Sequence, residues 1–329
     1  MRLEGEKMAI VTMWVDDLLL FADSAETMAE IKTDICTEWE TTDMGEPSKI
    51  VGIEINQSPD GISISQKQSI QSILEKQGLD DASSVKMPLD PCVKILPNPD
   101  GNEGDWSNLY AQLLGELQFV ANSTRPDIAF TVNRLTSYTV NSSMQHQTSL
   151  KQILQYLSGT RDLGITYKHT PEPTPFYGYA DTAYKNRDDG KSTSGYVFID
   201  AGSTITWQSN KQTVTAQSST EAEYIALWEA EKEVSWLRNL YKDLGLTQEN
   251  PTMLISDSTG AVAIARDPLF HKRTKHINSH FHWIREKIQA GRLVAKLCPG
   301  KEQTADMLTK PLPCPAHEKH MHGMGLMPV

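Results

Sequence analysis

The segment from Tyr177 to Val197, YGYADTAYKNRDDGKSTSGYV, is the part of this 329-residue chain from which the fold can be inferred most directly. It reads as two strands joined by a polar turn, because aromatic and small residues flank the turn-forming run NRDDG. The first strand carries one carboxylate, Asp181, among residues that otherwise suit burial. Such an acid is either an edge-strand residue that faces water or a ligand for a positive charge, and the strand alone leaves both interpretations open.

Regular elements are expected to follow this strand pair. Strands at 175–184, 194–201 and 203–209 are separated by short turns, which predicts an antiparallel meander. One long helix covers 218–245, and Gly245 ends it. The remaining order is strand TMLISD, helix STGAVAIARD, helix INSHFHWIREKIQAG, strand RLVAKLC and a last helix near TADMLTK. This order predicts a mixed sheet with helices covering it.

The first half is expected to combine strands with helices, and a proline-rich segment at 168–176 separates it from the second half. The predicted elements are two strands within 8–23 around the turn at 15–17, a helix with Asp23 as its N-cap, strands KIVGIEI and GISISQ around Pro59-Asp60-Gly61, a loop over 86–105 and mostly helix over 107–157. We interpret the fold class as mixed α+β and α/β.

Composition and charge exclude several classes of protein. No apolar run reaches the ~18 residues of a membrane span, the N-terminus is a poor signal peptide, and the four cysteines show no paired spacing, so we expect an intracellular, cytoplasmic or nuclear protein that is not secreted and does not bind membranes. The net charge of −11 is concentrated in residues 1–173, which hold 13 basic and 25 acidic residues. The basic cluster at 271–276 in the second half can therefore still meet phosphates.

Four acids stand out by their placement in the second half: Asp181, Glu223, Asp257 and Asp306. Each also has an ordinary explanation, because Glu223 can complete a capping box, Asp257 can cap the helix after it, and Asp306 can complement a helix dipole. Strand ends and helix ends of a mixed sheet can converge on one crevice, where gathered carboxylates repel one another unless a divalent cation neutralises them. Their order along the predicted elements favours two Mg²⁺ ions, with Mn²⁺ as a substitute.

Six motifs of the second half resemble the ribonuclease H domain of copia-type retrotransposon polyproteins: YGYADTAY, DDGKSTSGYVF, TWQSNKQ, SSTEAEY, FHKRTKHINSHFHWIRE and EQTADMLTKPL. The resemblance implies a five-stranded mixed sheet with flanking helices, and an endonuclease that hydrolyses the RNA strand of an RNA–DNA hybrid with divalent metal. The family's four catalytic, metal-binding acids fall on Asp181, Glu223, Asp257 and Asp306, and the family pattern favours Glu223 over its rival Glu221. The loop PGKEQT lacks the histidine that related enzymes carry, and Lys301 is the nearest candidate there.

The first half resembles the reverse transcriptase of the same polyproteins, from the end of the palm through thumb and connection. WVDDLLLFADS, KIVGIEI, LLGELQFVANSTRPDIAFTVNRL and LKQILQYLSGTRDLGITY carry this resemblance. Asp16 and Asp17 match the metal-binding pair of the polymerase, with Trp14 where tyrosine is usual. Because the third palm aspartate and the fingers are not present, the expectation is a truncated polymerase without activity, in which Asp16 and Asp17 are vestigial metal ligands.

The expected organisation is therefore a partial reverse transcriptase at 1–170, a ribonuclease H-like domain at 174–313 and a frayed C-terminal tail at 314–329. Expected partners are an RNA–DNA hybrid and the missing N-terminal part of the reverse transcriptase. Two rivals are a non-catalytic remnant that binds nucleic acid or a polymerase subunit, and an integrase-type transferase, which the early position of Glu223 disfavours.

Basic residues and histidines supply further candidates. Lys211, Lys272, Arg273 and Lys275 are the predicted phosphate contacts, and binding through them should weaken as salt rises. His276, His280 and His282 have a spacing compatible with metal ligands, although structural or phosphate-contacting roles are favoured because no cysteines complete a zinc pattern. Cys314, His317, His320 and His322 give a weaker indication of a metal site.

Overall fold

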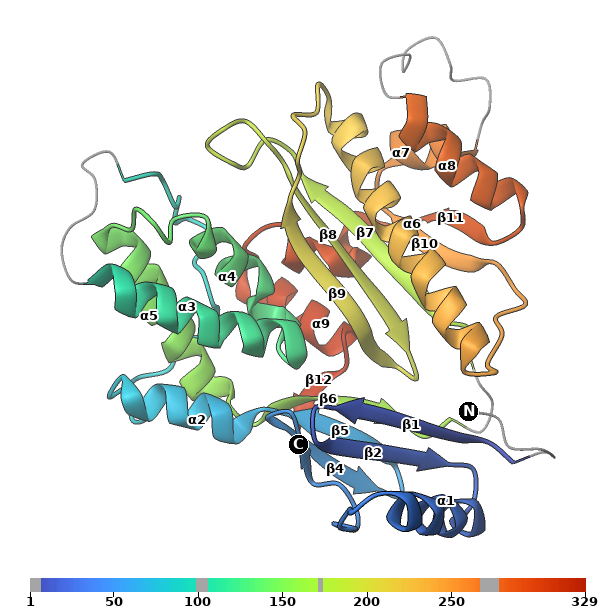
Figure 1. The fold of residues 1–329 in the computed structure, drawn as a ribbon. Coiled ribbons are helices and arrows are strands. Elements are labelled where there is room, and N and C mark those ends of the chain that lie inside the picture. The colour runs from blue at the N-terminus through green and yellow to red at the C-terminus, as the bar shows by residue number, and fades with distance from the viewer. Residues whose placement is uncertain (1–6, 99–105, 171–173, 267–277) are drawn as a thin grey trace. The chain divides into compact units, whose positions relative to one another are not determined.

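The computed structural model describes residues 7–98, 106–170, 174–266 and 278–329 (Figure 1). The chain divides into two compact units, Met1–Asn56 and Gln57–Val329, so the division falls inside a strand near residue 56 and not at 170–174. Within the described ranges, no helix combines the length and the apolar character needed to cross a lipid bilayer.

The first unit begins with the predicted strand pair and helix: β1 (Ala9–Trp14), β2 (Asp17–Ala22) and α1 (Ala25–Glu38). The two strands pair antiparallel, and Val15 turns the chain with a φ of +52°. Asp23 is not the N-cap of α1, because the Oγ of Ser24 accepts the capping hydrogen bond from the Thr27 amide at 3.1 Å. Asp23 instead accepts from the Met8 amide at 2.7 Å, which ties the start of the helix to the start of the hairpin.

The expected strand KIVGIEI is a hairpin of two strands, β3 (Lys49–Ile50) and β4 (Ile53–Ser58), which pair antiparallel. Val51 and Gly52 form the turn with φ values of +48° and +77°. Two consecutive residues with positive φ match the twist of the flanking strands, which is why such turns connect hairpins. The sequence does not predict this turn, because β-branched residues such as valine rarely adopt positive φ.

The second unit contains a five-stranded mixed sheet in the order β11-β10-β7-β8-β9. Its strands are β7 (Tyr177–Ala183), β8 (Thr193–Asp200), β9 (Ser203–Lys211), β10 (Thr252–Ser256) and β11 (Leu293–Leu297). The first three form the predicted antiparallel meander, while β10 pairs parallel with both β7 and β11. The strand that carries Asp181 is thus the central one, with neighbours on both sides.

The sheet is buried on both faces, and alternate residues of β8 show the two faces. Tyr196 and Phe198 pack with α6 (Ser219–Asp243), α7 (Thr259–Arg266) and α8 (Asn278–Gln289) in one hydrophobic core (Figure 1). Val197 and Ile199 belong to a second core on the opposite face. This period of two, combined with burial on both sides, explains why the strand contains the uninterrupted apolar run YVFI at 196–199.

The second core contains helices of the first half of the chain. One of them, at Lys67–Lys76, was not predicted from the sequence. The helices are α2 (Lys67–Lys76), α3 (Trp106–Ser123), the 3₁₀ helix η1 (Pro126–Ile128), α4 (Ala129–Thr136) and α5 (Met144–Thr160). Residues of these helices pack in the same core as Val197 and Leu308. Segments expected in two separate domains therefore share one core.

The expected frayed tail at 314–329 is wrong for the described structure. It forms α9 (Cys314–Gly323) and β12 (Leu326–Pro328), and β12 pairs antiparallel with β6 (Leu163–Lys168), which in turn pairs with β5 (Gly61–Ser65). Met321, Met324 and Leu326 are buried in the second core, so apolar burial fixes the end of the chain.

The expected last helix near TADMLTK is a short 3₁₀ helix, η4 (Thr304–Leu308), preceded by η3 (Gly300–Glu302). It packs directly on the sheet beside β7 and β8. Gly195 permits this approach, because a Cβ at that position would lie 2.7 Å from the Cβ of Leu308. Gly195 is also paired with Asp181 across the two strands, so η4 and the residues after it lie next to this carboxylate.

Candidate functional site: a carboxylate group at one edge of the mixed sheet

Asp181 is a buried acid in the central strand, with only 2% of its surface exposed. The edge-strand explanation for this residue is therefore excluded. Its Oδ2 atom accepts a hydrogen bond from the Thr309 hydroxyl at 2.5 Å. One such bond does not replace the water that a buried carboxylate loses, so the site needs further positive charge or a proton.

Asp257 directly follows β10, whose parallel pairing with β7 places the carboxyl ends of both strands at the same edge of the sheet. The helix-capping explanation does not hold for Asp257, because Ser258 performs that role. The Ser258 Oγ accepts from the Ala261 amide at 3.3 Å at the start of α7. The Asp257 carboxylate is thus not used for helix capping and is available to bind a ligand at this edge of the sheet.

Glu223 and Glu221 are separated by their roles at the start of α6. Ser218 is the N-cap, with its Oγ accepting from the Glu221 amide, and the Glu221 carboxylate accepts from the Gln217 amide at 2.9 Å. Glu221 therefore completes the cap. Glu223 is half-buried, and its buried Oε2 has no hydrogen-bond partner in the part of the chain that the structure describes.

Three of the predicted carboxylates converge. Each of Asp181, Glu223 and Asp257 offers one oxygen, and these oxygens all lie within 4.8 Å of one another. Burial and the neighbouring acids raise the pKa of Asp181 to about 6 and that of Glu223 to about 9, and burial and Asp181 also raise the pKa of Asp257. The three groups thus resist ionisation together, as expected for partly or fully buried acids that share a site.

Asp306, the fourth predicted acid, lies on η4 beside Asp181 but outside this group of three. Its Oδ1 atom forms an ion pair with the Lys310 ammonium at 2.8 Å, and the same ammonium lies 4.0 Å from the Asp181 Oδ2. Burial alone would lower the pKa of Lys310, but Asp181 and Asp306 outweigh it and raise that pKa. Lys310 is therefore a charged component of the site.

The donor set fits a hard divalent cation. All ligand candidates are carboxylate oxygens, which Mg²⁺ and Mn²⁺ prefer. The buried Glu223 Oε2 without a hydrogen-bond partner in the described residues is the type of atom that such an ion would satisfy. Asp181, Glu223 and Asp257 could hold one ion, and Asp306 lies where it could contribute to a second.

Thr309 and Lys310 are not among the site residues predicted from the sequence, although both lie in the motif EQTADMLTKPL. Their contacts with Asp181 depend on the turn after η4, where the Thr309 and Lys310 amides both donate to the Asp306 carbonyl at 3.1 Å. Lys310 follows Asp306 by four residues, which is the spacing of a helical ion pair and the one indication in the sequence.

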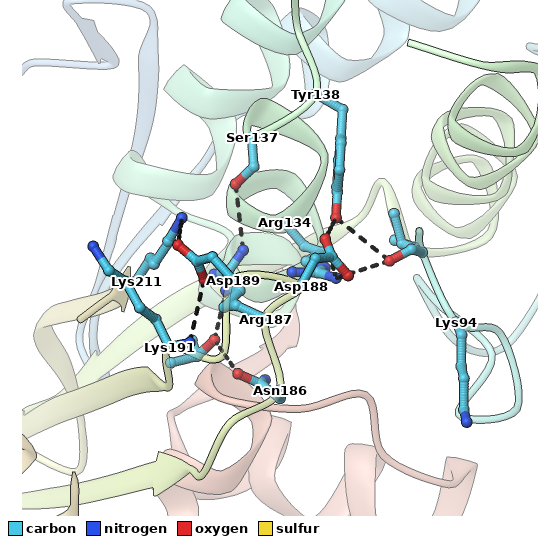
Figure 2. Close-up of polar contacts among 12 residues, drawn as sticks. Lys94, Arg134, Ser137, Tyr138, Asn186, Arg187, Asp188, Asp189, Lys191 and Lys211 are labelled. Atoms are coloured by element: carbon cyan, nitrogen blue, oxygen red, sulfur yellow. Dashed lines mark hydrogen bonds and ion pairs between the residues drawn. The ribbon is translucent and has the colours of Figure 1, made fainter. Parts of the chain in front are cut away.

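Lys211, a predicted phosphate contact, is ion-paired with Asp189 at 2.7 Å, and both side chains are about two-fifths exposed (Figure 2). The turn between β7 and β8 that carries Asp189 is anchored to α4. Arg134 on α4 pairs with Asp188 of the turn at 3.1 Å, and the Tyr138 hydroxyl also donates to Asp188 (Figure 2). Lys211 thus lies beside a turn held in place by buried contacts.

The other predicted phosphate contacts and the first histidine set cannot be placed. The side chains of Lys272, Arg273, Lys275, His276, His280 and His282 lie outside the described residues.

The predicted polymerase pair and the second histidine set are described. Asp16 and Asp17 are exposed at the β1–β2 turn, and the structure joins them to no three-member metal-ligating group among the described residues. His317 is buried with its Nε2 3.1 Å from the Tyr156 hydroxyl. The Cys314 Sγ donates a hydrogen bond to Glu318 Oε1 at 3.3 Å. No metal-ligating group in the described ranges includes His317, His320 or His322.

Comparisons with known proteins agree with this description. A reverse transcriptase (RNA-dependent DNA polymerase) family model matches residues 1–91. The retrovirus-related Pol polyprotein of transposon TNT 1-94 from Nicotiana tabacum is 32% identical over 95% of this chain and 24% of its own length. That of transposon RE1 from Arabidopsis thaliana is 31% identical over 98% of this chain and 22% of its own length.

A solved structure shares the fold. The foamy viral protease-reverse transcriptase, determined with an RNA/DNA hybrid, matches 88% of this chain and 36% of that protein, with a TM-score of 0.51 and 12% identity. This chain spans about a quarter of the length of the curated relatives that it matches. Sequence similarity over nearly the whole chain shows that it belongs to the Pol polyproteins of copia-type retrotransposons.

Proposed function

We propose that this chain hydrolyses the RNA strand of RNA–DNA hybrids, using divalent cations held by the carboxylate group. The observation that carries the proposal is the convergence of Asp181, Glu223 and Asp257 from two parallel strands and a helix, within 4.8 Å. Bound Mg²⁺ or Mn²⁺ would supply the positive charge that neutralises these acids and assists displacement at a phosphodiester by water. The raised pKa values of the group support a functional role, since such shifts concentrate at reactive sites.

The protein residues have distinct roles in this proposal. Asp181 and Asp257 lie on neighbouring strand ends and would share the cations, because the sheet fixes their separation. Glu223 reaches the group from α6 and would orient the attacked nucleotide as well as one cation. Asp306 would hold the second cation. Thr309 fixes the Asp181 carboxylate through its hydrogen bond, so the central ligand keeps one orientation.

An RNA–DNA hybrid suits this chain as a substrate for two reasons. The foamy viral structure with the shared fold contains such a hybrid. A protein can recognise a hybrid by backbone shape and 2′-hydroxyl groups without reading sequence. The ammonium of Lys211, which is partly exposed, would contact the phosphate backbone, and the products would carry 3′-hydroxyl and 5′-phosphate ends.

The decisive experiment compares two glutamates on the same helix. The purified chain with Mg²⁺ should cut the RNA of an end-labelled hybrid and leave single-stranded RNA intact. Glu223→Gln should reduce the cleavage rate about 1000-fold or more, since it removes a ligand charge from the group. Glu221→Gln, two residues away, should cut like the wild type, because Glu221 serves the helix cap.

Two outcomes would contradict the proposal. If the wild-type chain binds a hybrid but leaves it uncut across a range of Mg²⁺ and Mn²⁺ concentrations, it is a nucleic-acid binding module and not a nuclease. If Glu223→Gln cuts as fast as Glu221→Gln, the carboxylate group is not the site of hydrolysis. Circular dichroism of each variant confirms that the fold is retained.

A further inference from the structure

We propose that Lys310 is a built-in cation that competes with a divalent ion for the Asp181–Asp306 side of the carboxylate group. The inference rests on the proposed function, because it assumes that these carboxylates hold divalent cations. It assigns a positioning role to a lysine that the proposed hydrolysis does not itself require. This competition predicts that the two divalent ions bind with clearly different affinities.

The position of Lys310 is set by the turn after η4. Its amide donates to the Asp306 carbonyl at 3.1 Å, which folds the chain back so that the side chain lies over the Asp306 carboxylate. The ammonium lies 2.8 Å from Asp306 Oδ1 and 4.0 Å from Asp181 Oδ2. It therefore occupies the space between two of the four acids, where a shared ion would have to bind.

A divalent ion and this ammonium cannot use the Asp306 oxygen together without strong repulsion. Mg²⁺ binds a carboxylate oxygen at ~2.1 Å, so an ion on Asp306 would lie within a few ångströms of the lysine nitrogen. Like charges at such separations repel strongly when both are partly removed from water. The second ion must therefore displace Lys310 before it can bind.

Glu223 and Asp257 have no such competitor among the described residues. Neither Glu223 nor Asp257 forms an ion pair among the described residues, and the buried Glu223 Oε2 lacks a hydrogen-bond partner there. The first ion is thus expected on Asp181, Glu223 and Asp257. Lys310 forms its ion pairs with Asp181 and Asp306, and it keeps the Asp181 carboxylate partly neutralised before any second ion arrives.

Displacement of Lys310 is feasible because its side chain is 41% exposed. A lysine head on a flexible four-carbon stem can move into water without leaving a buried charge behind. The buried Arg125 shows the alternative, since its side chain is fully enclosed and hydrogen-bonded to Asp127 and Thr160. The ion pair between Lys310 and Asp306 is instead partly exposed, so it can open.

The test measures metal binding without nucleic acid. The full chain, freed of metal with a chelator, is titrated with Mn²⁺ by calorimetry, and bound ions are counted by electron paramagnetic resonance. The wild type should bind one ion tightly and a second weakly. Lys310→Gln should bind the second ion about tenfold tighter or more, because one unit charge a few ångströms away is removed. Lys310→Arg keeps the charge and should bind like the wild type.

A matched control separates local from overall charge. Lys151→Gln, at an exposed position on α5, removes the same charge from the molecule and should leave both affinities unchanged. If Lys310→Gln and the wild type bind the second ion equally, the role of Lys310 is wrong while the proposed nuclease remains. If no variant binds any divalent ion, the proposed function and this inference both fail.

A second measurement on the wild type avoids any effect of substitution on folding. Amine labelling with an N-hydroxysuccinimide ester, followed by mass spectrometry, reports whether the Lys310 amine is free. Saturating Mg²⁺ should increase labelling of Lys310 relative to Lys151, because the displaced amine enters water. Unchanged or reduced labelling at saturating Mg²⁺ would overturn the inference.

Discussion

Asp127 and Asp181 are both about 2% exposed, yet their surroundings have opposite electrostatic character. Asp127 accepts from Arg125 at 2.9 and 2.6 Å and from the Tyr156 hydroxyl at 2.7 Å. Burial alone would raise the pKa of Asp127, but Arg125 outweighs burial and lowers it. Burial and the acidic neighbours raise the pKa of Asp181 to about 6, although Lys310 and the Thr309 hydroxyl partly offset them.

The difference separates an acid that holds the fold together from an acid that is available for chemistry. Arg125 and Asp127 join η1 to the end of α5, because Arg125 also donates to the Thr160 carbonyl, and Tyr156 connects this pair to His317 on α9. None of the buried side-chain nitrogen or oxygen atoms of Arg125 and Asp127 lacks a hydrogen-bond partner. The group around Asp181 keeps capacity unused, which favours a ligand from outside.

The largest expected effect is on the activity of Asp181→Asn. This change should reduce hybrid cleavage about 1000-fold or more, since the central ligand loses its charge. The metal-free fold should be as stable as the wild type or more stable, because repulsion with Asp306 and Glu223 is relieved. Rates of hybrid cleavage and urea denaturation in the presence of a chelator measure the two effects. A strong loss of metal-free stability would show that Asp181 is a structural acid like Asp127.

Asp127→Asn is expected to have the reverse profile. It leaves the buried Arg125 without a counter-charge, which should lower the free energy of unfolding by about 3–5 kcal/mol. Urea denaturation at neutral pH measures this loss. The cleavage rate per folded molecule should change little, because Asp127 is not one of the predicted ligands. Equal stabilities of Asp127→Asn and Asp181→Asn would remove the distinction between the two sites.

The pH dependence of metal-free stability should also separate the two sites. Asp181 and Glu223 have pKa values raised to about 6 and about 9 in the folded protein, so the folded state binds more protons than the unfolded state above their ordinary values of 3.8 and 4.5. The stability that Asp181 and Glu223 contribute to the metal-free fold is therefore lost as pH rises through 6 and 9. The lowered pKa of Asp127 acts oppositely, since its contribution is lost as pH falls below 3.8.

Urea denaturation with a chelator at pH 5, 7 and 9 tests this dependence. The wild type should lose several kcal/mol between pH 5 and 9, because each unit of raised pKa corresponds to about 1.4 kcal/mol. Glu223→Gln should flatten the decline, and added Mg²⁺ should reverse it because the ion favours the deprotonated carboxylates. A wild-type stability that rises steadily from pH 5 to 9 without metal would contradict the raised pKa values.

The smallest effect is expected at Lys211, whose pair with Asp189 is exposed. Lys211→Gln should change the free energy of unfolding by at most about 1 kcal/mol. It should weaken hybrid binding and reduce the slope of log affinity against log salt by about 1, if the ammonium contacts a phosphate. Fluorescence anisotropy at several salt concentrations measures both. Asp189→Asn is the matched control, and it should bind hybrid at least as well as the wild type because it frees the lysine.

Much of the fold could be predicted from the sequence because its information is local. Alternating apolar residues in β7 to β9, the long apolar stripe of α6 and the turn-forming runs placed most elements of the mixed sheet close to their observed bounds. The Val51–Gly52 hairpin and the caps Ser24 and Ser218 were not predicted, because each depends on backbone angles that several residue types can adopt.

The sequence by itself determined that Asp181, Glu223, Asp257 and Asp306 stand near strand ends and helix starts. Only the tertiary structure decided that three of them converge while Asp306 pairs with Lys310. It also decided that Asp127, which resembles any other acid in the sequence, is enclosed with Arg125. The physical reason is that the charge state of a carboxylate depends on what burial removes and on which charges remain within a few ångströms, and both follow from contacts between distant segments.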